Sequence, residues 1–208
     1  MENRKIPLVN NFNTTKTIMK KILLFALFIS LITCKAQIYP LNTFFEDVPN
    51  YSYIKDLDNL LPQYVGTYKA TFQGNEITLF ITKEDKILID YGSNDKKYYQ
   101  DVLHIKYIVK KISTGTILQD TINPIDPKRN KIISIGIALY DNNAIVLNYS
   151  GTNCGVGNGS IRLKKPSDNQ ISWSYYPDDS LLDIKECPLS LDRTVYLPVA
   201  KDLIFTKQ

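Results

Sequence analysis

Residues 64–91, with the sequence YVGTYKATFQGNEITLFITKEDKILIDY, decide the fold of this chain. Apolar and polar side chains alternate on both sides of Gly74-Asn75, which is the pattern of half-buried β-strands. Gly74 and Asn75 accept a positive φ easily, so they favour a two-residue hairpin turn. Residues 83–86 are all charged and predict a second turn before the next apolar run. The stretch therefore predicts three short antiparallel strands in succession.

The same alternation continues toward the C-terminus. Further candidate strands lie at residues 98–112, 116–122, 132–140, 144–150, 160–165, 170–176 and 203–206. Short turns, such as residues 141–143 and 166–169, join most of them. Because no amphipathic helix longer than two turns separates the strands, we expect an all-β fold, an antiparallel meander that curls into a barrel. A β-sandwich is the alternative, and parallel α/β architectures are disfavoured.

The remaining segments divide the chain by composition. The only helix candidate spans residues 56–61, where Asp56 is suited to cap the N-terminus and Pro62 is expected to stop the helix. Residues 37–55 are rich in Pro, Asn and aromatic side chains, which indicates an extended arm. The predicted segments are residues 1–18, a start-site extension; residues 19–36, an export leader; residues 37–55, the arm; and residues 56–208, a single barrel domain.

Residues 19–33 have the pattern of a secretory signal peptide. Met19-Lys20-Lys21 forms a short positive region, and an apolar run follows at residues 22–33. This run is too short for a transmembrane helix, which takes roughly 20 apolar residues. Since a signal peptide normally begins with its positive region, we expect Met19 to be the natural start of the protein.

Two processing chemistries overlap at the end of this leader. Leu31-Ile32-Thr33-Cys34 approximates a bacterial lipobox, in which Cys34 becomes the acylated first residue. Two acyl chains would anchor the protein stably to a membrane. Alternatively, cleavage after Ala36 would release a soluble periplasmic or secreted protein. We expect an outer-membrane or cell-surface lipoprotein, with simple release as the alternative.

The charge distribution argues against nucleic acid as a partner. The formal net charge is +4, but residues 1–36 hold six Lys or Arg and one acid. The rest of the chain therefore carries 19 basic and 20 acidic residues. A basic surface of the kind that binds phosphate backbones is thus not expected on the folded part.

The cysteines agree with export. Processing at Cys34 leaves Cys154 and Cys187, which predict one disulfide in an oxidising compartment. In the chain-entropy model such a bridge contributes roughly 3 to 4 kcal/mol. The alternative is two free buried thiols. Neither cysteine has a partner at CxxC spacing, so a zinc site is disfavoured, and we expect no metal and no cofactor.

Two resemblances add to this interpretation. Residues 58–69 resemble the first strand of lipocalin-like barrels, with Tyr68 after Gly66 in place of the usual Trp. The second resemblance is carried by the leader ending at 34–37, the blocks at 65–69, 74–79 and 101–107, and the ending at 197–207. In these blocks the chain is similar to an uncharacterised family of small exported proteins of flavobacteria and their relatives. That resemblance implies an envelope or extracellular setting and no assigned activity.

Few residues suggest catalysis. His104 is the single histidine, and in a strand over residues 102–109 it shares the outer face with Lys106 while Leu103 and Ile105 face the core. No carboxylate near His104 in the sequence orients it, so we expect a surface or structural residue. The acidic pairs Asp56/Asp58 and Asp178/Asp179 are typical of solvated turns.

The glycine-rich loop at residues 151–160 and the tyrosines are the remaining features. The loop lacks the Gly-Lys-Ser/Thr ending of a P-loop, so we expect a sharp turn that Cys154 pins, with a ligand-gripping loop as the alternative. The doublets Tyr98-Tyr99 and Tyr175-Tyr176 must each place one ring outward on a strand. Such rings fill or decorate a barrel, or else they offer contact surface to glycans or proteins.

These observations favour an exported, lipid-anchored, non-catalytic β-barrel module. Its expected partner is a small apolar ligand, a glycan or an envelope protein, and it would meet the membrane only through the lipid. Two alternatives stay open. One is an envelope hydrolase that uses carboxylates and His104, and the other is a structural partner in an envelope complex.

Overall fold

The computed structural model describes residues 20–21, 37–90, 92, 96–123, 129–179, 187–188 and 190–208. Residues Ile38–Gln208 form a compact unit of their own. Cys34 and the apolar run of the predicted leader lie outside the described residues. Within those ranges, no helix has the length and apolar character that crossing a membrane requires.

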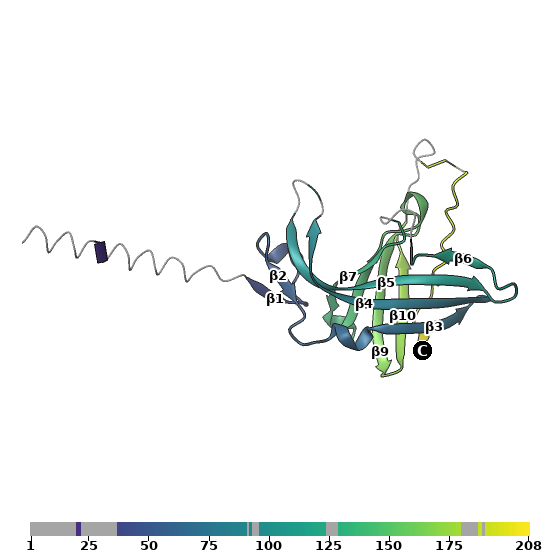
Figure 1. Cartoon of the computed structure of the whole chain (residues 1–208), viewed down its shortest axis with the longest axis horizontal. Coiled ribbons are helices and arrows are strands. Elements are labelled where there is room, and N and C mark those ends of the chain that lie inside the picture. Colours follow the sequence, from purple (N-terminus) through teal and green to yellow (C-terminus); the bar gives the residue numbers. More distant parts are fainter. Residues whose placement is uncertain are drawn as a thin grey trace, which may run out of the picture. The chain divides into compact units, whose positions relative to one another are not determined.

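The strands close into an antiparallel barrel, which confirms the predicted meander (Figure 1). Each barrel strand pairs with the next barrel strand in the sequence, and the last pairs with the first. In the described part of the chain the eight barrel strands are β3 (Gly66–Phe72), β4 (Asn75–Asp90), β5 (Lys97–Lys111), β7 (Ile132–Ala138), β8 (Ala144–Tyr149), β9 (Gly159–Ser167), β10 (Gln170–Pro177) and β11 (Leu203–Lys207).

One edge of β5 is shared by several partners. The three strands added to the barrel are β1 (Ile38–Pro40), β2 (Tyr53–Lys55) and β6 (Ile117–Asp120). β2 pairs in parallel with the beginning of β5, and β6 pairs antiparallel with its end. Between them, β7 meets β5 at only two positions, His104 and Ile105. The arm is thus part of the sheet, and the contact that closes the barrel is short.

The charged residues 83–86 form a bulge, so the predicted turn at this place is wrong. β4 continues without a break, and its pairing with β5 shifts register between Glu84 and Ile87. Lys86 has a φ of 54° at this point. A bulge takes up extra residues while the strand stays paired and bends, which explains why a polar interruption does not end β4.

The helix predicted at residues 56–61 is displaced toward the C-terminus. A single 3-10 turn, η2 (Leu61–Tyr64), contains Pro62 in its first turn. The Asp56 carboxylate accepts hydrogen bonds from the backbone N–H of Leu60 at 2.8 Å and of Leu61 at 2.9 Å. The N-cap residue is Leu60, so the predicted N-cap position of Asp56 is wrong, although its carboxylate still binds N–H groups at the start of η2. Pro62 starts the helix, because the first helical turn needs no backbone N–H from it.

The other helical elements are equally short. They are the 3-10 turns η1 (Phe45–Asp47), η3 (Leu139–Asp141) and η4 (Asn153–Gly155). Within the described residues no helix reaches seven residues. Helices therefore contribute little to the core, and the barrel strands supply most of it.

Large side chains fill the core. Trp173, Tyr68, Tyr107, Tyr149 and Phe205 are all fully buried. The Trp173 indole N–H donates to the backbone carbonyl of Pro198 at 3.1 Å, and its ring centre lies 5.8 Å from that of Phe205. A barrel of this size either holds a ligand or is filled by its own side chains, and these residues occupy the interior of this one.

Candidate functional site

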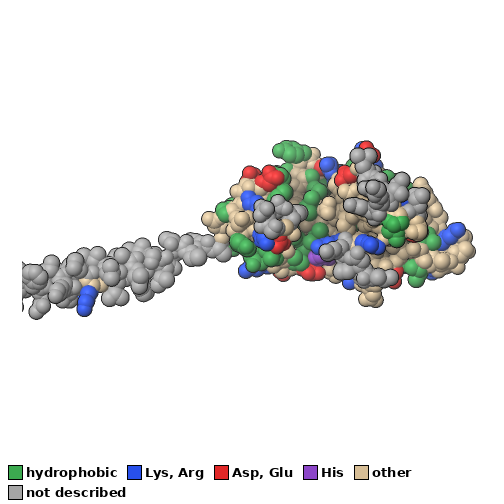
Figure 2. Space-filling view, turned by 90° about the horizontal axis from the view of Figure 1, so that it is seen from above, with side chains coloured by type: hydrophobic (Ala, Val, Ile, Leu, Met, Phe, Trp, Pro, Cys, Tyr) green, Lys and Arg blue, Asp and Glu red, His purple; other side chains and the backbone are tan. Residues whose placement is uncertain are grey.

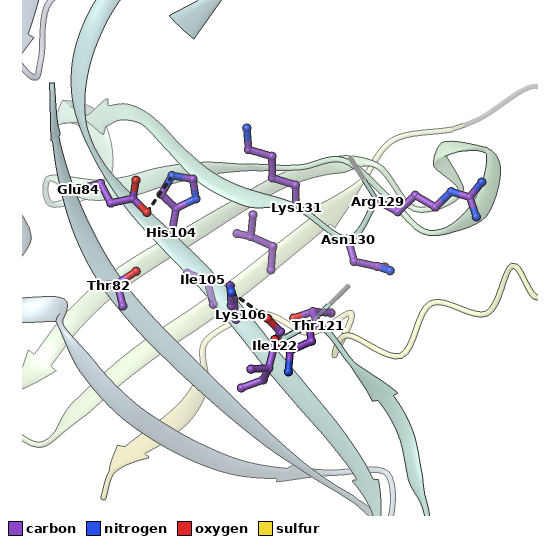
Figure 3. Close-up of a pocket in the computed structure, with 12 residues that line it drawn as sticks. Thr82, Glu84, His104, Ile105, Lys106, Thr121, Ile122, Arg129, Asn130 and Lys131 are labelled. Carbon is purple, nitrogen blue, oxygen red and sulfur yellow. Dashed lines mark hydrogen bonds and ion pairs between the residues drawn. The ribbon is translucent and has the colours of Figure 1, made fainter. Parts of the chain in front are cut away.

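A cleft of about 620 Å³ lies beside the short contact between β5 and β7. It borders the place where β6 takes over from β7 as the partner of β5. Thr82, Glu84, His104 and Lys106 of β4 and β5 line one wall (Figure 3). The residues around Lys131, where the chain enters β7, line the other.

Strand alternation on β5 brings the cleft residues to the outer face of the barrel. Ile105 and Tyr107 are buried, while His104 is half-buried and Lys106 is exposed. This confirms the two faces predicted from the sequence. Figure 2 shows the single histidine at the molecular surface with Lys or Arg side chains beside it.

Glu84 is the carboxylate nearest to His104. The His104 Nε2 atom lies 3.8 Å from Glu84 Oε1. The two residues are far apart in sequence, but Thr82 pairs with His104 across the β4–β5 ladder and Glu84 follows two residues later on the same strand. Sequence reasoning missed this neighbour, because it depends on the register of the hairpin. Only knowledge of the pairing register of β4 and β5 could have revealed that Glu84 lies beside His104.

Burial and nearby charges together lower the pKa of His104. Burial lowers its pKa from the ordinary value of 6.5, and the positive charges of Lys131 and Lys106 lower it further. Glu84 acts in the opposite direction. Since the pKa remains lowered, the two lysines and burial outweigh the single carboxylate.

The cleft contains more positive than negative charge. Among the described lining residues, Lys106, Arg129 and Lys131 are permanent cations and Glu84 is the only carboxylate. The Lys106 ammonium donates to the backbone carbonyl of Ile122 at 2.8 Å. Arg129 points away from the cleft and donates to the side-chain carbonyl of Asn153. No ion pair of Lys106 or Lys131 is found among the described residues.

A partly buried polar cluster lies behind the cleft. The Asn130 side-chain oxygen accepts hydrogen bonds from Tyr149 at 2.9 Å, Gln119 at 3.1 Å and Tyr107 at 3.2 Å. Burial raises the pKa of Tyr149 to about 12, so its hydroxyl stays protonated and donates. Tyr149 and Gln119 therefore fix the Asn130 side chain, which also lines the cleft, while the Tyr107 hydroxyl is closer to the Gln119 oxygen, at 2.8 Å.

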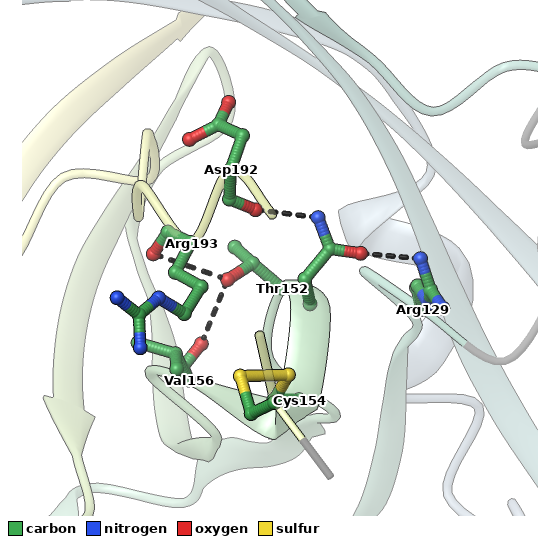
Figure 4. The surroundings of a disulfide bond; sticks show 8 residues. Arg129, Thr152, Cys154, Val156, Asp192 and Arg193 are labelled. Carbon is green, nitrogen blue, oxygen red and sulfur yellow. Dashed lines mark hydrogen bonds between the residues drawn. A yellow bond between two sulfur atoms is a disulfide. The ribbon is translucent and has the colours of Figure 1, made fainter. Parts of the chain in front are cut away.

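The glycine-rich loop lies next to this cluster, and its disulfide is present (Figure 4). Cys154 and Cys187 are joined with a Cα–Cα distance of 5.9 Å, which confirms the predicted pair. Gly151 has a φ of 79°, and a Cβ there would lie 2.5 Å from the backbone of Gly155. The glycine is required by this close approach, as the predicted sharp turn implies.

The loop also contacts the rim of the cleft. The Asn153 amide N–H donates to the backbone carbonyl of Asp192, and its oxygen accepts from Arg129 (Figure 4). The Tyr175 hydroxyl donates to the backbone carbonyl of Gly157. These contacts, together with the disulfide, hold the loop in one conformation beside the cleft.

Asp101 forms a second polar site on β5, at the junction with the arm. Its carboxylate is only 2 % exposed and accepts hydrogen bonds from the Tyr53 hydroxyl and from the backbone N–H groups of Asp56 at 3.0 Å and Lys86 at 2.9 Å. Burial raises the pKa of Asp101, but these donors and the charge of Lys83 outweigh burial and lower it. The site fastens the arm and the β4 bulge to the barrel.

The other predicted candidates lie apart from the cleft. Asp56 caps the turn before η2, and its neighbour Asp58 is exposed. Asp178 and Asp179 are both exposed. Within the described ranges, no group of three or more His, Cys, Asp or Glu side chains is arranged to hold a metal ion.

The tyrosine doublets alternate as the strands require. Tyr98 and Tyr175 are buried, whereas Tyr99 is half-buried and Tyr176 is exposed. The Lys86 ammonium lies 5.4 Å from the centre of the Tyr99 ring. The outer rings therefore contact neighbouring cations of the protein itself.

A protein-family model matches residues 19–208 of the chain. The chain belongs to DUF6705, a family of unknown function. No curated protein and no solved structure gave a significant match to this DUF6705 chain. The match spans both walls of the cleft and the disulfide, so the whole barrel lies within the family region.

Proposed function

We propose that this DUF6705 chain is an exported, non-catalytic binding module that takes a small molecule in the cleft beside β5. The observation that carries the proposal is the cleft of about 620 Å³, whose size suits a small ligand. The interior is occupied by large aromatic side chains, which favours this outer cleft over a lipocalin-like internal site.

Export is supported by two independent features. The leader pattern at residues 19–33 is that of a signal peptide. The Cys154–Cys187 disulfide is the kind of bond that persists outside the reducing cytoplasm. We propose that acylation of Cys34 anchors the module in the cell envelope, with the arm connecting the lipid to the barrel.

Intact mass tests the export part of the proposal. Protein purified from the membranes and from the medium of its own host is measured before and after reduction and alkylation. A diacylated mass that begins at Cys34 is expected, with one disulfide. A soluble mass that begins at Gln37 would replace the anchor by release, and a cytoplasmic protein that keeps its leader would contradict export.

Native mass spectrometry of the same preparation tests the binding part. A small molecule is expected to co-purify with the protein. Thr82→Trp places a large ring in the cleft and should remove that molecule, since Thr82 is an exposed strand residue on its wall. Thr71→Trp is the matched control, because Thr71 is exposed on β3 and does not line the cleft. Equal occupancy in both variants would contradict the cleft as the site.

A hydrolase is the second candidate function, because His104 and Glu84 share the cleft. A lowered histidine pKa leaves the imidazole free to accept a proton at neutral pH. His104→Gln distinguishes the two functions. In a binding module it should weaken occupancy only partly, because Lys106 and Lys131 also line the cleft, whereas in an enzyme it should abolish conversion of the bound molecule.

A further inference from the structure

We propose that the ligand of the cleft is a small organic anion with an oxyanion head group and a short apolar body. Lys106, Lys131 and the imidazole of His104 would bind the head group. This inference rests on the proposed binding function and names the chemical class of its ligand.

The first support is the unbalanced charge of the cleft. Lys106 and Lys131 form no ion pair among the described residues, whereas the half-buried Lys69 on β3 pairs with Glu76 at 3.3 Å. Outside the leader the chain is almost neutral, with 19 basic and 20 acidic residues. The excess of positive charge among the described residues that line the cleft is therefore a local feature and not a consequence of overall composition.

The second support is that the charges of both lysines affect one residue of the cleft, His104. Both positive charges act on the His104 imidazole, although Lys106 lies on β5 and Lys131 on the chain that enters β7. Both side chains also line the same cleft, so a ligand in that cleft lies near both of them. The His104 imidazole, which lines the same cleft, can donate a hydrogen bond from its N–H in the neutral form.

The walls of the cleft supply the apolar part of the site. Ile105 and Ile132 are buried behind it, and Ile122 lines it beside the Lys106 ammonium. A low-dielectric wall focuses the field of the lysines into the cavity. The isoleucines also give a short hydrocarbon body a surface to cover.

Glu84 limits how charge is distributed on the ligand. It is the only carboxylate among the described lining residues, and it lies next to His104. A ligand with negative charge at both ends would place one end against Glu84. The cleft therefore favours an anion whose charge is confined to one end.

The single histidine gives a direct measurement. Hexanoate, hexanol and inorganic phosphate are titrated into the mature protein, and the His104 imidazole proton signal is followed by NMR. Hexanoate should shift the signal saturably and bind at least about threefold more tightly than hexanol, which has a body of similar length without the charge. Inorganic phosphate, a head group without a body, should bind more weakly than hexanoate.

Charge variants test the assignment of the lysines. Lys106→Gln and Lys131→Gln keep hydrogen-bond donors but remove the charge, and each should weaken hexanoate binding by about twofold to fivefold. Lys110→Gln is the matched control, because Lys110 is an exposed lysine on β5 outside the cleft. It should leave hexanoate affinity unchanged.

Three results would overturn the inference. Equal affinity for hexanoate and hexanol would remove the role of charge, and equal affinity for hexanoate and phosphate would remove the apolar body. An unresponsive His104 signal with all three probes would reject this ligand class. If a molecule still co-purifies with the protein and Thr82→Trp removes it, the proposed binding function stands while the anion assignment fails.

Discussion

Two polar sites lie close together on β5 and differ in how their charges are satisfied. Asp101 is buried, and its carboxylate accepts hydrogen bonds from the arm and from the β4 bulge. Lys106 and His104, a few residues later, face a cleft in which the lysines have no carboxylate partner among the described residues. The same strand thus carries one closed site and one open site.

The difference separates a structural role from a binding role. A buried charge contributes to stability only when other groups of the protein satisfy it. Asp101 meets that condition, so its partners belong to the fold. Lys106 and Lys131 place positive charge at a cavity. Solvent satisfies this charge, so the stability of the fold does not depend on a protein partner for it, and the charge remains available to an external anion.

The strongest test of this comparison is the removal of Asp101. Asp101→Ala leaves the Tyr53 hydroxyl and the N–H groups of Asp56 and Lys86 without their acceptor. We expect a loss of about 3 to 5 kcal/mol in the free energy of unfolding, measured with denaturant. Asp58→Ala, at an exposed position just after the arm, is the control and should change stability little. Similar losses for both would contradict the closed character of the site.

Acid should act on the same site. The folded state lowers the Asp101 pKa below its ordinary value of 3.8, so the folded protein binds this proton less readily than the unfolded chain. The stabilisation is present above that value and is lost as the pH falls through the folded-state pKa. When the free energy of unfolding is measured from pH 6 downward, it should therefore decrease less with falling pH for Asp101→Asn than for the wild type. Identical pH profiles would show that the carboxylate does not stabilise the fold.

The open site should respond differently. Lys106→Gln and Lys131→Gln should each leave the free energy of unfolding within about 0.5 kcal/mol of the wild type. The physical reason is that neither charge has an ion-pair partner to lose among the described residues. A large loss of unfolding free energy in either variant, measured in the same denaturant series, would mean that these lysines stabilise the fold. The cleft would then not differ from the Asp101 site in this respect.

The smallest expected effect is a pKa change at His104. Lys131→Gln removes one of the charges that lower this pKa, so the His104 pKa should rise toward 6.5, as read from its NMR titration. Because the folded-state pKa is lowered, this histidine makes the protein less stable as the pH falls below 6.5. Glu84→Gln should change the pKa in the opposite direction. A shift in the same direction for both variants would contradict the proposed balance of charges.

Much of this fold could be predicted because it repeats a local pattern. The alternation along residues 64–91 predicts the β3–β4 hairpin, and that along β5 places His104 and Lys106 on the outer face. The predicted turn at Gly74-Asn75 is wrong by one residue, because Asn75 already pairs with Phe72 and the turn residues are Gln73 and Gly74. The two cysteines predict the disulfide by elimination. Each of these inferences needs only neighbouring residues or a count.

The errors arose where a residue has a distant partner. Residues 83–86 have the composition of a turn, but Asp101 binds the N–H of Lys86 and β5 keeps the bulged strand paired. Pro62 is a usual helix stop, yet Asp56 places it in the first turn of η2. The arm strands β1 and β2 escaped prediction because they are short and pair in parallel with distant residues.

The sequence by itself determined the all-β class, the meander order, the disulfide and the face on which His104 lies, because strand period and hairpin turns are local properties. Only the tertiary structure decided that Glu84 lies beside His104, that Asp101 closes the arm junction, and that Lys106 and Lys131 share a cleft. The physical reason is that strand register and the β5–β7 contact bring together residues that no local pattern connects.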